Sequence, residues 1–306
     1  MEFLSYLVTG ISLGSIYAII ALGYTMVYGI AKMLNFAHGD VIMVGGYVAF
    51  YATSYAAGNV LGENPSSAAT AAASVVAVLL AMLVCTVLGV VIEGLAYKPL
   101  RSAPSLAVLI TAIGVSYFLQ NAAQLIFGAA PKNFTPVVSG QLQLFGGQLR
   151  ISYIALLTVV TCLVIMAALT TFINKSKMGK AMRAVSEDKG AAQLMGINVN
   201  GTISMTFAIG SALAAIAGVL LCSYSPVLQP TTGSMPGIKA FTAAVFGGIG
   251  SVPGAFLGGL LLGIIESLAQ AYISTQLSNA ILFAVLIVVL LVKPSGLLGK
   301  YVPEKV

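Results

Sequence analysis

The sequence predicts an all-α, polytopic membrane protein with about eight or nine transmembrane segments. Of its 306 residues, 59% are hydrophobic and only 7% are charged, whereas soluble domains carry about 25% charged residues. The mean hydropathy is +1.02. Apolar runs of about 20 residues, the length that a helix needs to span a bilayer, recur along the whole chain. These observations exclude a soluble protein.

Nine apolar segments follow one another, and they lie at 5–30, 40–57, 68–95, 105–127, 150–173, 202–224, 238–249, 253–272 and 278–293. The seventh is too short to cross a hydrocarbon core of about 30 Å alone. It lies between "MPG" and "GGIGSVPG", which is typical of a broken or re-entrant helix that lines protein or water. No linker or charge shift divides the chain, so residues 1–306 are expected to form a single membrane domain.

Basic residues predict the orientation of the chain. The loop 174–200 carries five Lys or Arg residues, which places it in the cytoplasm because cytoplasmic loops are enriched in basic residues. The tail carries Lys293, Lys300 and Lys305. It is also inside if 238–249 counts as a crossing, which gives nine segments with the N-terminus outside. Eight segments with the tail outside is the competing count.

Other features exclude further classes of protein. Cys85, Cys162 and Cys222 each lie within an apolar stretch, which argues against a disulfide framework or a metal site. The N-terminal "MEFLSYLVTG" lacks a basic region, so we expect no cleaved signal peptide. The net charge of +6 comes mostly from loops, and it reports topology rather than nucleic-acid binding.

The charged loop has a helical pattern of its own. Seven charged residues fall within 175–197. Apolar residues recur at i, i+3, i+4 and i+7, which predicts a short amphipathic helix; they are Met178, Ala181, Met182 and Val185. A second short helix is expected after it, with Ser186 as its N-cap.

Glu187 and Asp188 would then lie in the first turn of the second helix, where the helix dipole favours acidic residues. Gly196 would end it in a left-handed conformation. Two interpretations remain open from these residues. The loop is either a positively charged segment resting at the lipid headgroups, or a helix that docks in a groove of a soluble partner.

The motifs of the chain, taken in order, resemble the permease subunits of ABC importers for branched-chain amino acids, and most closely the LivH type. The resemblance covers essentially the whole chain. It rests on "GYTMVYGIAKMLNFAHGD" (23–40), "EGLAYKPLR" (93–101), "MGKAMRAVSEDKGAAQLMGIN" (178–198) and "GIKAFTAAVFGGIGSVPGAFLGGLLLGIIE" (237–266).

The resemblance implies a function and a set of partners. The chain would be an importer's transport subunit in the bacterial cytoplasmic membrane and not an enzyme. Its partners would be a second permease (a LivM-like paralogue or a second copy), two ATPase subunits and an extracytoplasmic amino-acid-binding protein. By analogy with other ABC importers, the loop 174–200 would contact an ATPase through Arg183, Glu187, Asp188, Leu194, Met195 and Gly196.

We expect no cofactor on this chain. Neither Gly179-Lys180 nor Gly299-Lys300 has the glycine and Ser/Thr neighbours of a phosphate-binding Walker A loop. ATP and Mg²⁺ would therefore bind to the partner ATPases.

Polar residues within apolar segments are candidates for a substrate pathway or gate, because a charge near a helix centre in a membrane costs about 2.5–3.5 kcal/mol. Asp40, in "NFAHGD", is expected to cap a helix that begins at Val41, or to form a gate together with Asn35 and His38.

Gln120, Asn121 and Gln124 place amides on one helical face, which favours hydrogen bonds between helices or a polar strip along the pathway. Glu266 lies deep in its segment. It either pairs with another subunit or faces the pathway. Glu93 lies near Lys98 and Arg101 and is expected to form an ion pair or to extend to the membrane surface.

Small residues at intervals of four predict close contacts between helices, or in a second interpretation a gating contact. The sets are Gly10, Gly14 and Ala18; Gly250, Gly254 and Gly258; and Gly259 and Gly263. A short internal similarity links "LGVVIEGLA" (88–96) with "LGIIESLA" (262–269). These segments run in opposite directions in the predicted topology, as inverted repeats would.

Two other functional classes were considered. A stand-alone secondary transporter or channel for a small amino acid or amide would need a buried ion-coupling residue, and Glu266 is its best candidate. An intramembrane enzyme is disfavoured, because His38 is the sole histidine and the two aspartates, Asp40 and Asp188, lie in different segments.

Overall fold

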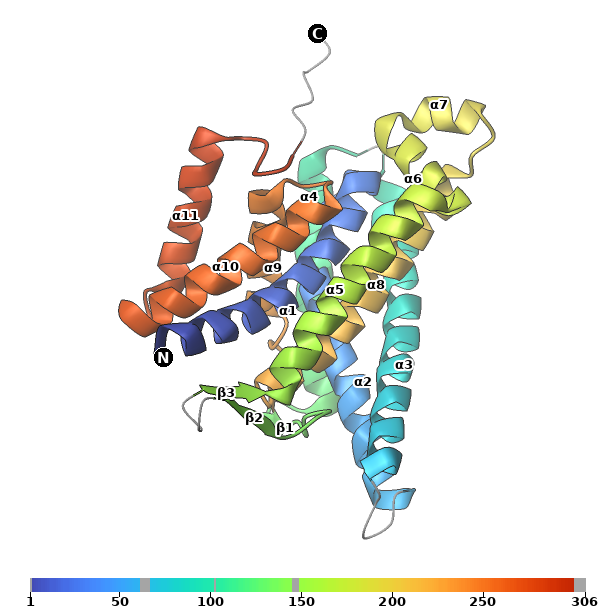
Figure 1. Cartoon of the computed structure of the whole chain (residues 1–306). Coiled ribbons are helices and arrows are strands. Elements are labelled where there is room, and N and C mark those ends of the chain that lie inside the picture. The colour runs from blue at the N-terminus through green and yellow to red at the C-terminus, as the bar shows by residue number, and fades with distance from the viewer. Residues whose placement is uncertain (1, 61–66, 102, 145–148, 300–306) are drawn as a thin grey trace. The chain divides into compact units, whose positions relative to one another are not determined.

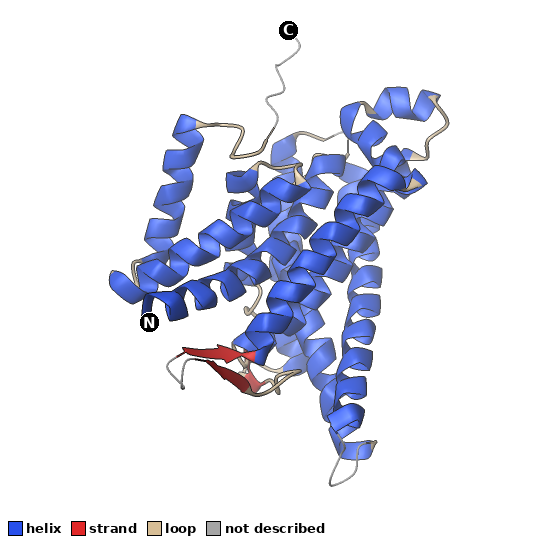
Figure 2. Ribbon diagram, viewed as in Figure 1, coloured by secondary structure: helices blue, strands red, loops and turns tan. Residues whose placement is uncertain are grey.

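The computed structural model describes residues 2–60, 67–101, 103–144 and 149–299, and helices dominate it (Figures 1 and 2). The long helices are α1 (Glu2–Ala31), α2 (His38–Asn59), α3 (Ser67–Ile92), α4 (Ser105–Phe127), α5 (Tyr153–Lys175), α8 (Val199–Tyr224) and α10 (Val252–Tyr272). Within the described residues, these seven segments are long and apolar enough to cross a membrane. The prediction of an all-α, multi-pass membrane protein is confirmed.

Shorter elements complete the chain. They are the π-helical turn η1 (Glu93–Tyr97), the 3₁₀ turn η2 (Lys98–Leu100), α6 (Lys177–Glu187), α7 (Lys189–Leu194), α9 (Ser234–Gly247) and α11 (Ser278–Val292). The 14 residues of α9 extend about 21 Å at 1.5 Å per residue, less than the thickness of a bilayer core. Lys300 and Lys305 of the predicted tail lie outside the described residues.

Short strands were not predicted. β2 (Gln141–Leu144) pairs antiparallel with β3 (Leu149–Ser152), and β1 (Lys132–Asn133) pairs antiparallel with β4 (Val227–Leu228). The pattern Gln-Leu-Gln-Leu in β2 has the period of two that is typical of a strand. Residues 149–152, expected at the start of the fifth apolar segment, form β3 instead, and α5 begins at Tyr153.

The chain divides into two compact units. Unit 1 comprises Met1–Lys32, Gln141–Ile197 and Lys239–Val306, and unit 2 comprises Met33–Gly140 and Asn198–Ile238. Both units draw on separated stretches of sequence, and the division falls inside α9, between Ile238 and Lys239. Neither unit is therefore a continuous domain of the kind that a linker would delimit.

In unit 1, α1 packs along α10. A Cβ atom added to Gly14 would lie 2.8 Å from the carbonyl oxygen of Leu260, and one added to Gly10 would lie 2.8 Å from the Cα atom of Ile264. Such short separations mean that the two backbones touch, which small residues permit. The helices α6 and α7 lie at one end of α5, and the β2–β3 hairpin lies at its other end (Figure 1).

In unit 2, α2, α3 and α8 pack on one another, and α4 packs on α2. A Cβ atom on Gly45 of α2 would lie 2.8 Å from the Cα atom of Ala215 in α8, so this contact also brings two backbones together. At the end of α4, Phe127 stacks on the buried Tyr47 of α2, with their ring centroids 4.3 Å apart. Aromatic stacking of this kind favours one position of the end of α4 against the middle of α2.

Candidate functional site

The loop 174–200 folds into α6 and α7, which confirms the two short helices predicted for it. Ser176 caps α6 by accepting a hydrogen bond of 2.8 Å from the Gly179 backbone N–H. Met182 and Val185, from the predicted apolar stripe, are fully buried within unit 1, where α6 contacts α1 and α5. The stripe therefore holds α6 against unit 1 and is not available to a partner.

The N-cap of the second helix is Asp188, and the prediction of Ser186 was wrong. The Asp188 carboxylate accepts hydrogen bonds from the backbone N–H groups of Gly190 (2.8 Å) and Ala191 (3.0 Å). Its φ of −153° and ψ of 114° are extended, as an N-cap requires. Ser186 remains inside α6, where its hydroxyl donates to the carbonyl of Arg183 at 2.7 Å.

Glu187 correspondingly ends α6 and does not lie in the first turn of α7. Gly196 has a φ of +80°, which is the left-handed stop that the sequence predicted. The Ile197 N–H then donates back to the carbonyl of Ala192. This hydrogen bond closes the end of α7 and holds its shape.

The tip of α7 exposes two large apolar side chains. Leu194 is 91% exposed and Met195 is 82% exposed. Glu187, Asp188 and Gly196 are exposed as well. A short helix that is capped at both ends thus presents a rigid apolar tip bordered by acidic groups.

Lys189 connects this loop to α1. Its ammonium donates a hydrogen bond of 3.0 Å to the carbonyl of Ala31, the last residue of α1. A cation is favourable there because the final carbonyls of a helix carry partial negative charge. The loop is therefore joined to the end of α1 by a polar contact as well as by the packing of α6.

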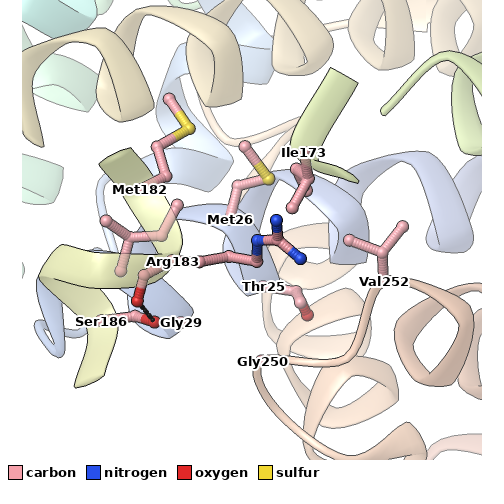
Figure 3. A pocket seen from close by; sticks show the side chains of 10 residues that line it. Thr25, Met26, Gly29, Ile173, Met182, Arg183, Ser186, Gly250 and Val252 are labelled. Atoms are coloured by element: carbon pink, nitrogen blue, oxygen red, sulfur yellow. Dashed lines mark hydrogen bonds between the residues drawn. The ribbon is translucent and has the colours of Figure 1, made fainter. Parts of the chain in front are cut away.

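Arg183, the remaining member of the predicted contact set, has a different position. It is exposed, but it lines a small pocket in unit 1 together with residues of α1 and α5 (Figure 3). All six residues assigned to the ATPase contact are exposed, and Arg183 also lines this pocket. Five lie from the end of α6 to the end of α7, and Arg183 lies one turn earlier.

A polar cluster in unit 2 contains most of the other predicted residues. The Gln120 amide donates to the Asp40 carboxylate at 2.9 Å and lies 3.2 Å from the hydroxyls of Ser116 and Ser234. The Tyr97 hydroxyl donates to the Asn35 side chain at 2.9 Å. Asn35, His38 and Asp40 are all buried.

One expectation about this cluster was wrong, and Gln120 bears out another in part, since it forms the hydrogen bond between helices that the amides of α4 predicted. Asp40 does not cap α2, because α2 begins at His38 and Asp40 lies in its first turn, where an acid still favours the helix dipole. Its carboxylate is therefore free to bond Gln120. Gln124 is exposed and does not join Gln120, and Asn121 donates to the Tyr117 carbonyl of its own helix.

Glu266 forms a cluster within its own chain, in unit 1. Its carboxylate accepts hydrogen bonds from the Lys239 ammonium (2.7 Å), the Tyr17 hydroxyl (2.9 Å) and the Gln270 amide (3.0 Å). Glu266 is 3% exposed and Lys239 is 8% exposed. Of the two alternatives for Glu266, pairing with another subunit was wrong, because Lys239 of the same chain is its counter-ion.

The glycines of the second predicted set, Gly250, Gly254 and Gly258, occupy two environments. A Cβ atom on Gly254 would lie 2.5 Å from the carbonyl oxygen of Gly247, and one on Gly258 would overlap the backbone of Ala243, so α9 and α10 meet at these positions. Gly250 lies in the turn before α10 with a φ of +95°. Its role is in this turn, since a left-handed residue cannot belong to a helix face.

Among the described residues, no group of three or more His, Cys, Asp or Glu residues is placed to hold a metal ion. The three cysteines are free and buried.

Comparison with known proteins places the chain in a family. Residues 6–290 match the family of the permease component of branched-chain amino acid transport systems. The chain belongs to this family. The permease protein BraD of a high-affinity branched-chain amino acid transport system of Pseudomonas aeruginosa is 45% identical, over 100% of this chain and 98% of its own length. LivH of Escherichia coli, with the same description, is 48% identical over the same shares of the two chains.

A permease protein with a different printed substrate also matches part of the chain. A fructose import permease protein, FrcC of Rhizobium meliloti, is 31% identical over 39% of this chain. No solved structure matches the chain. The match to the permease family spans residues 6–290, a range that contains both polar clusters and the loop 174–200.

Several residues at these sites of the permease were missed by sequence reasoning. Tyr17 and Thr25 are polar positions inside an apolar helix, and Lys239 is a cation inside an apolar segment. A lysine and a glutamate within two neighbouring apolar segments are a signal for an ion pair, because neither charge is stable there alone. The contact of Lys189 with α1 could not be predicted in this way, because lysines are common in basic loops.

Proposed function

We propose that this chain is a permease subunit of an ATP-driven importer that moves branched-chain amino acids into the cytoplasm by alternating access. The observation that carries the proposal is the similarity to BraD and LivH over the full length of the chain. The membrane is then the bacterial cytoplasmic membrane, with the loop 174–200 and the C-terminus inside and the N-terminus outside. A stand-alone secondary transporter is less well supported, because Glu266, its coupling candidate, already accepts three hydrogen bonds.

The remaining subunits would supply what this chain lacks. They are a second permease, either a paralogue or another copy, two ATPases that bind ATP and Mg²⁺, and an extracytoplasmic protein that delivers the amino acid. The chain itself is proposed to bind no cofactor. Its own pathway residues would be Asn35, His38, Asp40 and Gln120 in unit 2, with Glu266 in unit 1 as a structural ion pair.

The ATPase contact is proposed to be the apolar tip of α7. Leu194 and Met195 are exposed apolar residues on a helix that is capped at both ends, and such anchors suit a groove on a partner. Glu187, Asp188 and Gly196 border this tip. Closure of the ATPases would move α7, and Lys189 would pass the movement to the end of α1.

The proposal is tested by co-purification of tagged chain with its ATPases from membranes. Leu194→Ala combined with Met195→Ala should reduce the ATPase recovered at least about tenfold, because truncation of a central apolar anchor costs more than about 1 kcal/mol. Glu187→Ala and Gly196→Trp should also weaken the contact. ATP-dependent uptake of labelled leucine into vesicles should fall in parallel.

The control is the pair Leu291→Ala and Val292→Ala on α11, whose side chains are 79% and 81% exposed. This variant removes similar apolar surface from unit 1 and should leave ATPase recovery unchanged. If the Leu194 and Met195 variant retains full ATPase binding, the assignment of the tip is wrong. If wild-type chain recovers no ATPase at all, the importer proposal fails.

A further inference from the structure

A small pocket lies in unit 1 where α6 meets α1, α5 and the turn before α10 (Figure 3). Its cavity volume is about 80 Å³. Pockets for drug-sized ligands measure about 300–1,000 Å³, so this one suits only a short ligand. It is lined by Thr25, Met26, Gly29, Ile30, Ile173, Met182, Arg183, Ser186, Gly250 and Val252.

One polar group in the pocket has no hydrogen bond. Thr25 is 2% exposed, and its hydroxyl has no partner among the described residues. The buried helical hydroxyls of Thr158 and Thr206, by contrast, donate to the carbonyl four residues earlier, at 2.7 Å and 2.8 Å. A buried hydroxyl without a partner is unfavourable, and that of Thr25 can be satisfied by a ligand in the pocket.

The charge of the lining selects an anion. Arg183 is the only charged residue among the described residues that line the pocket, and its guanidinium is directed between Thr25, Ile173 and Val252 (Figure 3). Its one hydrogen bond to a side chain, with Asn174, is long at 3.5 Å. A guanidinium binds a carboxylate through paired N–H donors. Since no carboxylate lines the pocket, an ammonium group would find no counter-ion there.

Most of the remaining lining is apolar. Met26, Ile30, Ile173, Met182 and Val252 supply this apolar surface, and the hydroxyl of Ser186 already donates to the Arg183 carbonyl. We propose that this pocket binds a short branched-chain carboxylate that lacks an amino group, with the carboxylate on Arg183 and Thr25 and the alkyl body against these walls. The transported amino acids, as zwitterions, are poorer ligands for it.

The position of the pocket predicts that a bound ligand would affect transport. A molecule held between Arg183 and Thr25 connects α6 to α1, so it would restrain the loop that ends in α7. This consequence rests on the proposed function, because it requires that the loop transmits the action of the ATPases. The binding of the carboxylate does not depend on it.

The experiment uses isovalerate and valine, which differ by an amino group. Equilibrium dialysis of labelled isovalerate is performed on the purified full-length chain in phosphatidylcholine nanodiscs, without ATPases. We expect saturable binding to wild type. Arg183→Gln and Thr25→Val should each weaken it at least about tenfold, the range expected on losing a hydrogen bond to a charged group. Valine should bind at least about tenfold more weakly than isovalerate.

The control is Lys180→Gln, which removes a positive charge from the same helix outside the pocket. It should bind isovalerate like wild type. The melting temperature of each variant without ligand checks its fold; Thr25→Val should be unchanged or higher, because it removes a buried hydroxyl without a partner.

Equal affinity of wild type and Arg183→Gln would overturn the proposal, as would an equal loss in Lys180→Gln. Valine that binds as well as isovalerate would show a site for the amino acid instead. Stabilisation by phosphatidylglycerol nanodiscs but not by isovalerate would assign the arginine to a lipid headgroup. Because no ATPase is present, failure here leaves the co-purification result of the proposed function unaffected.

Discussion

Glu93 in unit 2 and Glu266 in unit 1 lie in similar sequences and are both buried, but they are neutralised in different ways. Each is followed by x-Leu-Ala and preceded by a glycine, Gly89 or Gly263, that packs against another helix of its unit. Each has one basic partner. The glycine allows close packing and the glutamate adds a polar contact next to it.

The two ion pairs differ in the exposure of the cation and in the elements that they join. Glu93 begins the turn at the end of α3, and its partner Arg101 is eight residues later, with a side chain 17% exposed. Ser204 adds a hydrogen bond of 2.6 Å. Glu266 lies inside α10, and its partner Lys239 is on another helix, with a side chain 10% exposed. The first pair closes a helix end locally, whereas the second joins two helices.

The largest loss of stability is expected when the Glu266–Lys239 pair, whose cation is the less exposed of the two, is broken. Lys239→Met leaves the carboxylate of Glu266 buried without a cation, and it should lower the free energy of unfolding by about 3–5 kcal/mol. The measurement is denaturation of the purified chain in mixed micelles. The double variant Lys239→Met, Glu266→Met should recover most of this loss, because a pair of apolar residues leaves no buried charge. If the free energy of unfolding of the double variant is as low as that of the single variant, the Lys239–Glu266 pair does not stabilise the packing of α9 on α10.

A smaller effect is expected at the glycine that precedes Glu266. A Cβ atom on Gly263 would overlap the backbone of Gly14, so Gly263→Ala should lower the free energy of unfolding by about 1–3 kcal/mol. Gly94, beside Glu93, has nothing within 4 Å of an added Cβ. The matched variant Gly94→Ala should therefore change the stability by no more than about 1 kcal/mol. Equal effects of the two variants, in the same denaturation assay, would contradict backbone contact between α1 and α10.

The smallest effect is expected for the pair at the end of α3. Arg101→Met should lower the free energy of unfolding by about 1–2 kcal/mol, because Arg101 is the more exposed of the two cations and the Glu93 carboxylate keeps the hydrogen bond from Ser204. Denaturation at low and at high salt provides a second comparison of the two ion pairs. Salt should weaken the wild-type Glu93–Arg101 pair more than the Glu266–Lys239 pair, since buried pairs are screened less.

The membrane helices could be predicted because hydropathy and length report them directly. The helices of the loop 174–200 could also be predicted, since the apolar spacing of α6 and the glycine after α7 are local signals. The N-cap was misplaced by two residues because Ser186 and Asp188 are both good caps, and the choice depends on where α6 ends. The structure continues α6 through Ser186 to Glu187, so Asp188 is left as the cap.

The polar clusters could be predicted only in part. Asp40, Gln120 and Glu266 were recognised because polar groups stand out in apolar segments. Their partners were not, since the contacts join residues 80 positions apart for Asp40 and Gln120, and 27 apart for Lys239 and Glu266. The unpaired hydroxyl of Thr25 could not be predicted at all, because helical threonines usually bond their own backbone.

The contact of Lys189 with Ala31 has a mechanical consequence. The 30 residues of α1 form a rod about 45 Å long. Its backbone touches that of α10, so the two helices cannot slide past each other as helices separated by long side chains can. A sideways displacement of 1 Å imposed by Lys189 at one end would tilt a rigid rod of this length by about 1°. Because Lys189 contacts the very end of α1, a small movement of the loop 174–200 would tilt α1 and α10 together.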